Sequence, residues 1–481
     1  INNGIHPGEP DGIDASMMLL RDLAEGLYSI PKNIRLVVIP IYNIGGALNR
    51  NNSTRVNQNG PLEYGFRGNS KNLDLNRDFI KNDSRNARIF RQIFHRYDPE
   101  IFIDNHVSDG ADYQHTMTLL STQYDKLGGA LGEYFRNTLD PLLYKKMDAA
   151  GWPMIPYVNV EDGIPDSGWT AFYDPPRFSS GYAALFQCIA WVPETHMLKP
   201  YPQRVAATEE LMKQIIQLAS TEAATIKALR KTDRANDLKK NSLPLSWSAS
   251  GRTMWPFLGY QAAYKKSEVT GMTRLYYDHT KPTKIEVPIT DHYLAKQFVK
   301  VPEAYIIPQG WHEMISRLLE DRRLEYGLLD EDTILSVTVY HIDSFETLSK
   351  PYEGHYKHSK IQVHTTVEKL KFRKGDYVFP TQQDGKRFLV ESLEPTGDDS
   401  YFAWNFFDAI MQRKEGYSDY RWEDVAADVL KRNPVLAEAL KAKRESDSKF
   451  AKDAEAQLLF VYEHSRWLEP EYRRYPVFKI D

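Results

Sequence analysis

Two residue types that bind metal ions stand close together near the start of the chain. His6-Pro7-Gly8-Glu9 places an imidazole and a carboxylate three residues apart, so both side chains can reach a single cation. By itself this pattern is weak, because a surface turn with incidental charges would have the same sequence. Support has to come from further ligands that other segments deliver to the same place.

Two apolar segments further along the chain each lead to a residue that could complete such a site. Glu100 to Asn105 is predicted to be a buried strand that ends before His106, and Leu185 to Val192 a second strand that ends before Glu194. Ligands of open α/β sheets bind outside the carboxyl ends of the strands, so both residues are expected to meet the first pair there. Two histidines and one glutamate suit a catalytic zinc ion, whose fourth position stays open to water.

The elements that must position these residues alternate between helix and strand in the first half of the chain. Helical spacing predicts helices at Leu19 to Leu27 and at Phe90 to Tyr97, and Arg35 to Ile41 is predicted to be another buried strand. A long helix is expected from Gln203 to about Leu238, and the polar residues 239–242 after it are the best candidate for a domain boundary. This alternation favours an α/β layer architecture.

The second half of the chain is predicted to be mainly β, with helices at its end. Segments bounded by Pro, Gly and Asp turns are predicted to be strands at Lys284 to Val287, Ile334 to Val339, Lys360 to Val367 and Arg387 to Leu393. From Trp422 to about Phe460 the pattern is helical. We therefore expect domains at residues 1–240, 241–410 and 411–481, the last being a helical segment packed on the rest.

The composition excludes several classes of protein. The 61 basic and 65 acidic side chains give a net charge of -4, which offers no basic surface for nucleic acid. A single cysteine, Cys188, excludes an intrachain disulfide framework, so a metal would have to be bound by His, Asp and Glu. The sequence contains no run of about 18 apolar residues, so no membrane span is predicted. Residues 1–5 already look like the tail of a strand, and we expect that a leading sequence has been removed.

Together these residues resemble the zinc carboxypeptidases of the carboxypeptidase A and B type, over roughly the first 200 residues. In that family a His-x-x-Glu pair and a later histidine bind one zinc ion, and the match falls on His6, Glu9 and His106. The resemblance implies an α/β fold with a twisted mixed sheet flanked by helices, followed here by a smaller, mainly β domain with C-terminal helices. It also implies that Glu194 is the general base that activates a zinc-bound water.

The segment from Asn72 to Asp78 resembles the family region whose Asn-Arg pair grips the terminal carboxylate of the substrate, here Asn76 and Arg77. An arginine offers a planar fork suited to a carboxylate, and the asparagine adds a neutral donor beside it. Asp74 falls where the family has a carboxylate that orients a zinc-binding histidine, which is expected to be His6.

The family also supplies an arginine that polarises the scissile carbonyl, and its position in this chain leaves alternatives open. The region from Asn43 to Asn59 resembles the corresponding part of the family, and Arg55 is our choice for this role. Arg50 and Arg67 are its rivals.

A mobile tyrosine normally precedes the catalytic glutamate in this family. Tyr173 lies at a suitable distance and Tyr182 is the alternative, although a packing role is nearly as plausible for either, since the chain has 29 tyrosines. His115 and His196 lie close enough to the predicted ligands in sequence to compete as ligands or proton carriers.

The chain departs from the family in three places. Gly8 stands where the pancreatic-type enzymes have an arginine that helps to hold substrate, so part of that subsite is expected to be missing or rebuilt. The strands and helix that normally precede the His-x-x-Glu motif do not stand before His6 here, and we expect that they either belong to the full precursor or have been lost from one edge of the sheet. In the second half, Pro302 to Trp311 and Trp404 to Phe407 resemble the C-terminal extension of some bacterial members, whose role is open.

The function expected from the resemblance is that of a zinc-dependent metallocarboxypeptidase with one Zn²⁺ per chain. It would hydrolyse the C-terminal peptide bond of peptides with a free C-terminus, and no nucleic-acid partner is expected. The expected location is secreted, periplasmic or envelope-associated in a bacterium. One alternative is a zinc amidohydrolase acting on N-acyl amino acids or cell-wall peptides. Another is a catalytically silent peptide- or glycan-binding protein, against which the presence of Glu194 beside three ligands argues.

Overall fold

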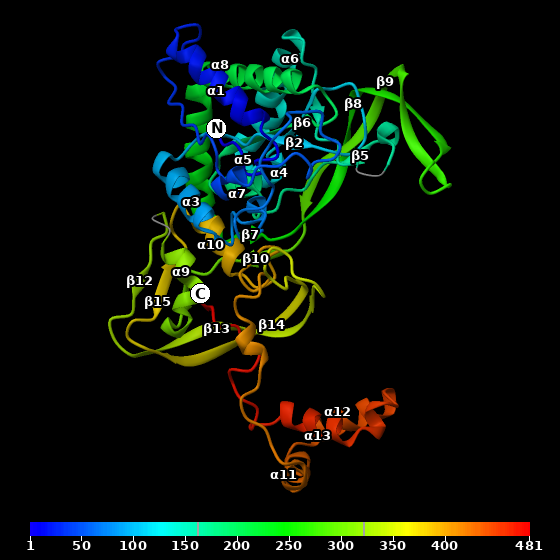
Figure 1. Cartoon of the computed structure of the whole chain (residues 1–481). Helices are drawn as coiled ribbons and strands as arrows, with labels where there is room; N and C mark the ends of the chain where they lie inside the picture. Colours follow the sequence, from blue (N-terminus) through cyan, green and yellow to red (C-terminus); the bar gives the residue numbers. More distant parts are fainter. Residues whose placement is uncertain (161–162, 321–322) are drawn as a thin grey trace.

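The first half of the chain is built around a five-stranded mixed sheet. The computed structural model describes residues 1–160, 163–320 and 323–481. In spatial order the sheet contains β1 (Ile101–Ile103), β6 (Ile189–His196), β3 (Met117–Ser121) and β4 (Ile155–Pro156), and β2 (His106–Ser108) also pairs with β6. β1 and β2 run parallel to β6, whereas β3 is antiparallel to it. The helices on both sides of this sheet confirm the predicted fold class (Figure 1).

Alternate residues of the central strands pack into different hydrophobic cores. Ile103, Ile189 and Trp191 belong to a core that includes residues of α8, whereas Phe102 and Ala190 pack on the opposite side with α3. This alternation is what a strand buried on both faces requires. The helices of this half are α1 (Asp11–Ala24), α2 (Ile44–Leu48), α3 (Arg85–Tyr97), α4 (Tyr124–Leu127), α5 (Gly129–Tyr134), α6 (Asp140–Ala149), α7 (Ser179–Ala184) and α8 (Tyr201–Lys239).

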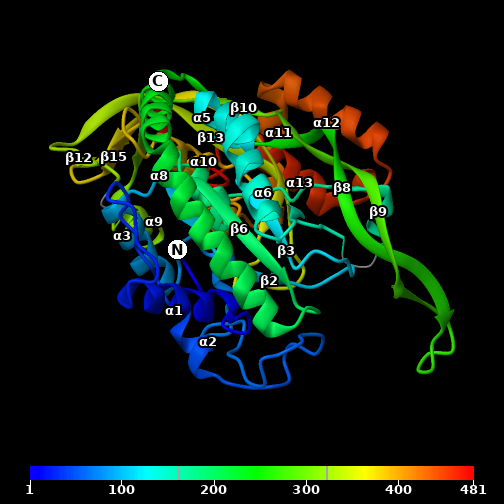
Figure 2. The same cartoon turned by 90° about the horizontal axis from the view of Figure 1, so that it is seen from above.

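Helix α8 confirms the long helix expected after the sheet. It has 39 residues and lies beside α1, with Ala15 and Leu19 of α1 packed against Met212 and Ile216 of α8 (Figure 2). Its sequence is punctuated by charged residues. In the described parts of the chain no helix is long and apolar enough to cross a membrane.

Three predicted strands differ from what the structure contains. Residues 35–41 are extended and bond to the first residues of the chain, but only Ile39 forms a bridge. The second predicted strand begins at Ile189 instead of residue 185, because the chain first turns after α7, with Gln187 at a φ of 51°. Arg387 to Leu393 is wrong as a strand: it is helix α10 (Lys386–Leu393). Its short apolar run fits either structure, and packing of Phe388 and its neighbours in the main core decides for the helix.

A long hairpin connects the two halves of the chain. Strands β8 (Trp247–Lys266) and β9 (Thr273–Ala295) form an arm that projects from the body (Figures 1 and 2). Strand β9 pairs with β5 (Trp169–Thr170), and further toward the tip of the arm the Gln114 amide donates to the carbonyl oxygen of Gly259 at 2.7 Å. The hairpin follows the predicted boundary in sequence, yet it hydrogen-bonds to the first half.

The rest of the second half is organised around a six-stranded sheet. Its spatial order is β12 (Gly327–Leu328), β15 (Tyr377–Pro380), β11 (Ala304–Ile307), β16 (Phe478–Ile480), β13 (Thr333–Thr347) and β14 (His358–Phe372). A separate pair joins β7 (Ser242–Pro244) to β10 (Phe298–Lys300), and helix α9 (His312–Leu319) precedes β12. The last strand of the chain therefore lies in the middle of this sheet.

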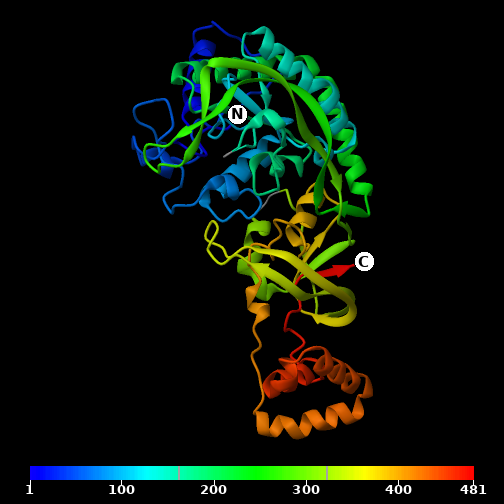
Figure 3. The same cartoon turned by 90° about the vertical axis from the view of Figure 1, so that its right-hand side faces the viewer.

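Three helices near the end of the chain pack mainly on one another. They are α11 (Asp419–Arg432), α12 (Pro434–Ser446) and α13 (Ala454–Glu463), and their apolar faces share a core around Trp422, Leu440 and Tyr462. Figures 1 and 3 show them as a group set apart from the body, whereas we expected this segment to pack on the rest. Because these faces cover each other, they need no other surface. The division into three domains stays a prediction.

Candidate metal centre and active site

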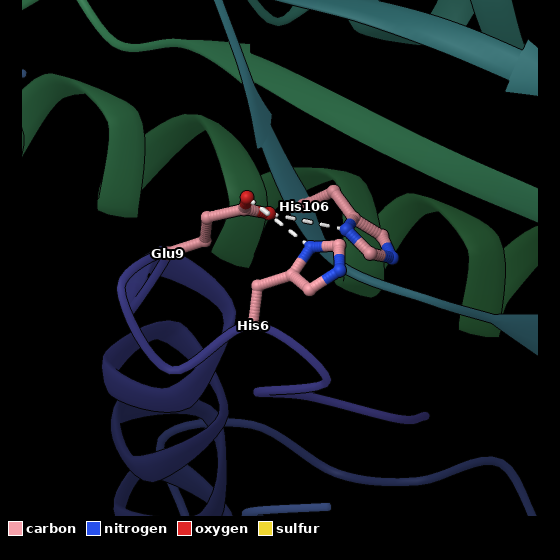
Figure 4. A group of neighbouring side chains, drawn as sticks. All are labelled: His6, Glu9 and His106. Carbon is pink, nitrogen blue, oxygen red and sulfur yellow. Dashed lines mark hydrogen bonds and ion pairs between the residues drawn. The ribbon is translucent and has the colours of Figure 1, made fainter. Parts of the chain in front are cut away.

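His6, Glu9 and His106 come together at the edge of the first sheet (Figure 4). The Glu9 carboxylate lies 3.2 Å from Nδ1 of His6 and 3.1 Å from Nδ1 of His106. All three side chains are at most 4% exposed, and their candidate ligand atoms lie within 4.8 Å of one another. Within the described ranges, no other group of three His, Cys, Asp or Glu residues meets this criterion.

A tight turn ahead of α1 presents the first two of these side chains. The backbone N–H of Glu9 donates to the carbonyl oxygen of His6 at 2.8 Å, and Pro10 then leads into the helix. A Cβ atom at Gly8 would lie 2.9 Å from Cδ of Arg55 and 3.2 Å from the carbonyl oxygen of Gly65. The stem of Arg55 therefore fills the space that an arginine at position 8 would need.

Each histidine has a carboxylate on its other ring nitrogen. Oδ1 of Asp74 lies 2.8 Å from Nε2 of His6, and Oδ2 of Asp104 lies 3.1 Å from Nε2 of His106. Such partners fix the ring orientation and tautomer of a metal-binding histidine. Both rings thus turn Nδ1 toward Glu9. Asp74 was predicted from the sequence but Asp104 was not, although the spacing of two residues between Asp104 and His106 indicates one face of a strand.

The electrostatics of this group favour a cation. Burial lowers the pKa of His106, but Asp104 and Glu9 outweigh this effect and raise that pKa well above its usual value. Burial raises the pKa of Glu9, yet His6 and Arg55 hold it well below its usual value. Nδ1 of His6 is buried and faces the Glu9 carboxylate at 3.2 Å, but it makes no hydrogen bond of good geometry with the described residues. Surroundings that stabilise a proton on the His106 ring would also stabilise a metal ion there.

Glu194 lies beside this group on the central strand. It is in register with His106 on the parallel strand β2, and its carbonyl oxygen accepts a hydrogen bond from Thr118 at 3.3 Å. Strand β6 continues through Glu194 to His196, so the residue sits within the strand, which was predicted to end before it. Burial raises the pKa of Glu194 to about 8; His106 opposes the rise and Glu9 adds to it.

Two of the three candidate arginines reach the metal-binding group. Nη1 of Arg55 lies 2.9 Å from Oε1 of Glu9, and Nη1 of Arg67 lies 3.3 Å from the same oxygen. Arg55 is largely buried and also donates to the carbonyl oxygen of Val107, whereas Arg67 is 46% exposed. Arg50 lies elsewhere, in an exposed pair with Glu63.

Asn76 and Arg77 lie in a short 3₁₀ turn, η1 (Leu75–Arg77), that follows Asp74. The Asp74 carboxylate accepts from the backbone N–H of Asn76 at 2.8 Å, which fixes the start of the turn. The Arg77 guanidinium donates to the carbonyl oxygen of Asn76 and lies 4.4 Å from the ring centre of Phe178. Oδ1 of Asn76 is buried with no partner in the described structure. Asn76 and Arg77 are therefore held in place, and the side-chain oxygen of Asn76 can still accept a hydrogen bond.

The two candidate tyrosines lie elsewhere. The ring of Tyr173 packs against Tyr293, with the ring centres 5.4 Å apart, and against the ammonium group of Lys126. The hydroxyl of Tyr182 lies 2.9 Å from Nε2 of His95 in the main core. Neither contact involves the metal-binding group, so the assignment of Tyr173 stays a prediction.

The two competing histidines are bonded to the backbone. Nδ1 of His115 lies 2.9 Å from the carbonyl oxygen of Pro153, and its Nε2 accepts from the N–H of Leu258 in the hairpin. Nε2 of His196 lies 3.0 Å from the carbonyl oxygen of Ala111. Burial lowers the pKa of both rings to about 4. Both residues lie outside the group that could hold a metal.

The large cavity of this half of the protein lies away from the candidate site. A cavity of about 730 Å³ lies between residues 32–39, α3 and α8. Its lining contains none of the predicted site residues. The candidate site is therefore identified by its chemistry.

Arg204 ties the elements of the site together. Its guanidinium is fully buried, pairs with Asp11 at 2.8 Å and donates to the carbonyl oxygens of Met197 and Gly60. These contacts join the start of α8 to α1 and to the turn after β6. Replacing Arg204 with Met is expected to lower the free energy of unfolding by about 3–5 kcal/mol, because Asp11 would keep a buried charge without its partner.

Denaturant unfolding followed by tryptophan fluorescence measures this change. Arg432→Met is the matched control, because Arg432 forms an exposed pair with Asp428, and its unfolding curve should match that of the wild type. Equal curves for Arg204→Met and the wild type would contradict the predicted role of Arg204.

The site belongs to the class of metal-dependent hydrolases. A buried His₂Glu group beside a carboxylate at the edge of a mixed α/β sheet can hold a divalent metal ion and move a proton next to it. The comparisons with known proteins narrow this class. No family model matches the chain.

Curated carboxypeptidases are similar to this chain over most of its length. Carboxypeptidase 2 of Trichophyton equinum is 22% identical over 443 residues, which cover 84% of this chain and 73% of the relative. Carboxypeptidase 2 of Trichophyton rubrum is 21% identical over 439 residues, with the same two shares. These relatives confirm the predicted resemblance to carboxypeptidases. The similarity also extends past the first 200 residues into the second half.

Solved structures of the same class overlap with a smaller part of the chain. A metallo-carboxypeptidase from Pseudomonas aeruginosa is 14% identical and has a TM-score of 0.34. That overlap covers 47% of this chain and 56% of the other. No conclusion about function rests on a similarity of this extent.

Proposed function

We propose that this chain is a zinc-dependent metallocarboxypeptidase that removes the C-terminal residue of peptides. The observation that supports this proposal most strongly is the buried convergence of His6, Glu9 and His106, with Glu194 in register beside them. The similarity to curated carboxypeptidases agrees with it.

His6, Glu9 and His106 would hold the zinc ion. Two imidazole nitrogens and one carboxylate are the donor set of a catalytic zinc site, and the buried Nδ1 of His6, which faces Glu9 without a well-formed hydrogen bond, fits a ligand role. When bound, the zinc ion would supply a Lewis acid that polarises the scissile carbonyl and makes water acidic enough to attack near neutral pH. Asp74 and Asp104 would keep the two rings oriented.

Glu194 would act as the general base. Its carboxylate accepts a proton from the attacking water and then donates it to the leaving amine. A bound cation would lower the raised pKa of Glu194 again and so would favour its ionised form near neutral pH. A base whose pKa lies close to the working pH transfers protons in both directions with a small penalty.

Asn76 and Arg77 would recognise the free C-terminus. The guanidinium can form two parallel hydrogen bonds with a carboxylate, and the asparagine side chain adds a further polar contact. Among the described residues, the nearest carboxylate oxygen to Arg77 belongs to Asp74, at 3.8 Å, so its guanidinium can still take up a further carboxylate. Arg55 would polarise the scissile carbonyl, and Arg67 lies at the same carboxylate.

Mass spectrometry of peptides incubated with the zinc-loaded protein tests the proposed function. Peptides with a free C-terminus should lose single C-terminal residues stepwise, and a zinc chelator should stop the loss. The same peptides with amidated C-termini are the matched control and should be cleaved at least about tenfold more slowly, because they offer Arg77 no charge.

Two outcomes of this experiment would contradict the proposal. Equal cleavage of amidated peptides would show that the free carboxylate is not recognised. Intact peptides after incubation with folded, zinc-containing protein would favour N-acyl amino acids, which present the same α-carboxylate, or a binding function without catalysis.

A further inference from the structure

A turn from the second half of the chain contacts the segment that carries the predicted carboxylate-binding pair. Residues Tyr352–His355 lie between β13 and β14, and Tyr352 and His355 exchange two backbone hydrogen bonds, of 2.7 and 3.0 Å. At the tip of this turn, the Glu353 carboxylate accepts from the backbone N–H of Asp74 at 2.6 Å. The two residues are 279 positions apart in the sequence.

Asp74 contacts both a candidate metal ligand and the turn that carries Arg77. One carboxylate oxygen lies 2.8 Å from Nε2 of His6 and also accepts from the N–H of Asn76. The other pairs with Arg67 at 2.8 Å. The position of Asp74 therefore sets both the orientation of a predicted metal ligand and the start of the turn that carries Arg77. Glu353 fixes the backbone of Asp74 from outside that segment.

The backbone of Glu353 adopts a conformation that rarely holds a glutamate. Its φ is 51°, and Gly354 follows at 82°. Tight turns with two positive φ values are usually made of Asn, Asp and Gly, because other side chains crowd the backbone there. A residue in such a conformation persists when its surroundings hold it, and here the side chain contact with Asp74 is the reason that the structure offers.

The turn is supported on both sides. Tyr352 stacks on the fully buried Trp404, with ring centres 5.9 Å apart and an interplanar angle of 11°. Nε2 of His355 lies 2.6 Å from Asp83 in the first half, and its Nδ1 lies 2.7 Å from Asn405. The segment that begins at Trp404, whose role the sequence left open, thus holds the turn against the site.

We infer that Glu353 is a positioning residue of the active site, supplied by the second half of the chain. It holds Asp74, and through Asp74 it holds the turn with Arg77 in place for the terminal carboxylate of the substrate. This inference rests on the proposed function. For this role, residue 353 needs only a side chain that is long enough to bring an acceptor atom to the N–H of Asp74.

Three substitutions of Glu353 separate the effect of side-chain length from that of its negative charge. Glu353→Gln keeps the length and an acceptor oxygen, Glu353→Asp keeps the charge but is one carbon shorter, and Glu353→Ala removes both. Aspartate also tolerates a positive φ better than glutamate, so Glu353→Asp should preserve the turn even if Glu353→Ala does not. Glu346→Ala on β13 is the matched control, because the exposed Glu346 forms an ion pair with the exposed Lys360, far in sequence from Asp74.

Two measurements on the full-length chain test the inference. Hydrogen–deuterium exchange of residues 74–77 should be about tenfold faster in Glu353→Asp and Glu353→Ala, and close to wild type in Glu353→Gln and Glu346→Ala. KM for a peptide with a free C-terminus should rise about tenfold in the same two variants, with kcat nearly unchanged. A general loss of folding would not produce this split between KM and kcat.

Several results would overturn the inference. Wild-type exchange and KM in Glu353→Asp would show that the contact with Asp74 does not position the segment. Equal effects of Glu353→Gln and Glu353→Ala would assign the effect to charge. The exchange measurement needs no turnover, so it distinguishes a failure of this inference from a failure of the proposed peptidase function.

Discussion

Replacing Glu194 with Gln is expected to lower kcat at least about 10²-fold while zinc stays bound. Glutamine has nearly the same shape, so it should keep the position on β6 opposite His106, but its amide cannot accept the proton of the attacking water. Glu194 lies outside the group of three residues whose ligand atoms cluster, so the metal content should not change. Steady-state kinetics on one peptide and a zinc determination on the same preparation measure both quantities.

Glu133→Gln provides the control for this variant. Glu133 lies exposed on α5, and its replacement makes the same chemical change without reaching the site. A kcat for Glu194→Gln within tenfold of the wild type would remove Glu194 from the role of base. Parallel loss of zinc and activity would instead show that Glu194 helps to hold the metal.

The convergence of the three candidate metal ligands could be predicted from the sequence because its signals are local. His6 and Glu9 lie three residues apart in one turn, and His106 follows an apolar segment that forms part of the central sheet. A short motif and a buried apolar run are both visible in a single window of sequence. Parallel pairing of β2 with β6 then brings Glu194 beside His106, as the rule for ligand sites in α/β sheets anticipates.

The remaining parts depend on contacts between distant segments. Glu353 reaches Asp74 across 279 residues, and no pattern in one sequence indicates that pairing. The hairpin of β8 and β9 bonds to the first half although it follows the predicted boundary, because a boundary in composition does not decide where a strand finds its partner. Helix α10 was predicted as a strand for the same reason: its environment, supplied by the main core, decides the conformation of a short apolar run.

Asp104 illustrates a local sequence signal that is too common to identify a functional residue by itself. Its spacing of two residues from His106 was visible in the sequence, but the same spacing is common wherever strands contain polar residues. The contact at 3.1 Å distinguishes it from such cases. The sequence thus indicated the residues that could bind a metal and one of the two carboxylates that contact them, Asp74, whereas the structure added Asp104.

His106→Ala is expected to abolish stoichiometric zinc binding and, with it, peptidase activity. The substitution removes one of two imidazole donors and leaves Glu9 and Asp104 as buried carboxylates without that partner. Loss of an orienting partner typically costs about 10–100-fold in metal affinity, so loss of the ligand itself should cost more. Competition with a chromogenic zinc chelator measures the affinity of each purified variant.

Two further variants turn this prediction into a graded series. Asp104→Asn keeps the size of the side chain but weakens its hold on Nε2 of His106, and should reduce zinc affinity about 10–100-fold. His464 directly follows α13 and contacts the backbone carbonyl of Phe460, so His464→Ala should leave the zinc affinity unchanged. If His106→Ala bound zinc as tightly as His464→Ala, the metal would have to lie elsewhere and the proposed catalytic centre would be refuted. A steep fall from control through Asp104→Asn to His106→Ala would instead place the ion at Nδ1 of His106, because only an ion at that atom depends on both the ring and the carboxylate that orients it.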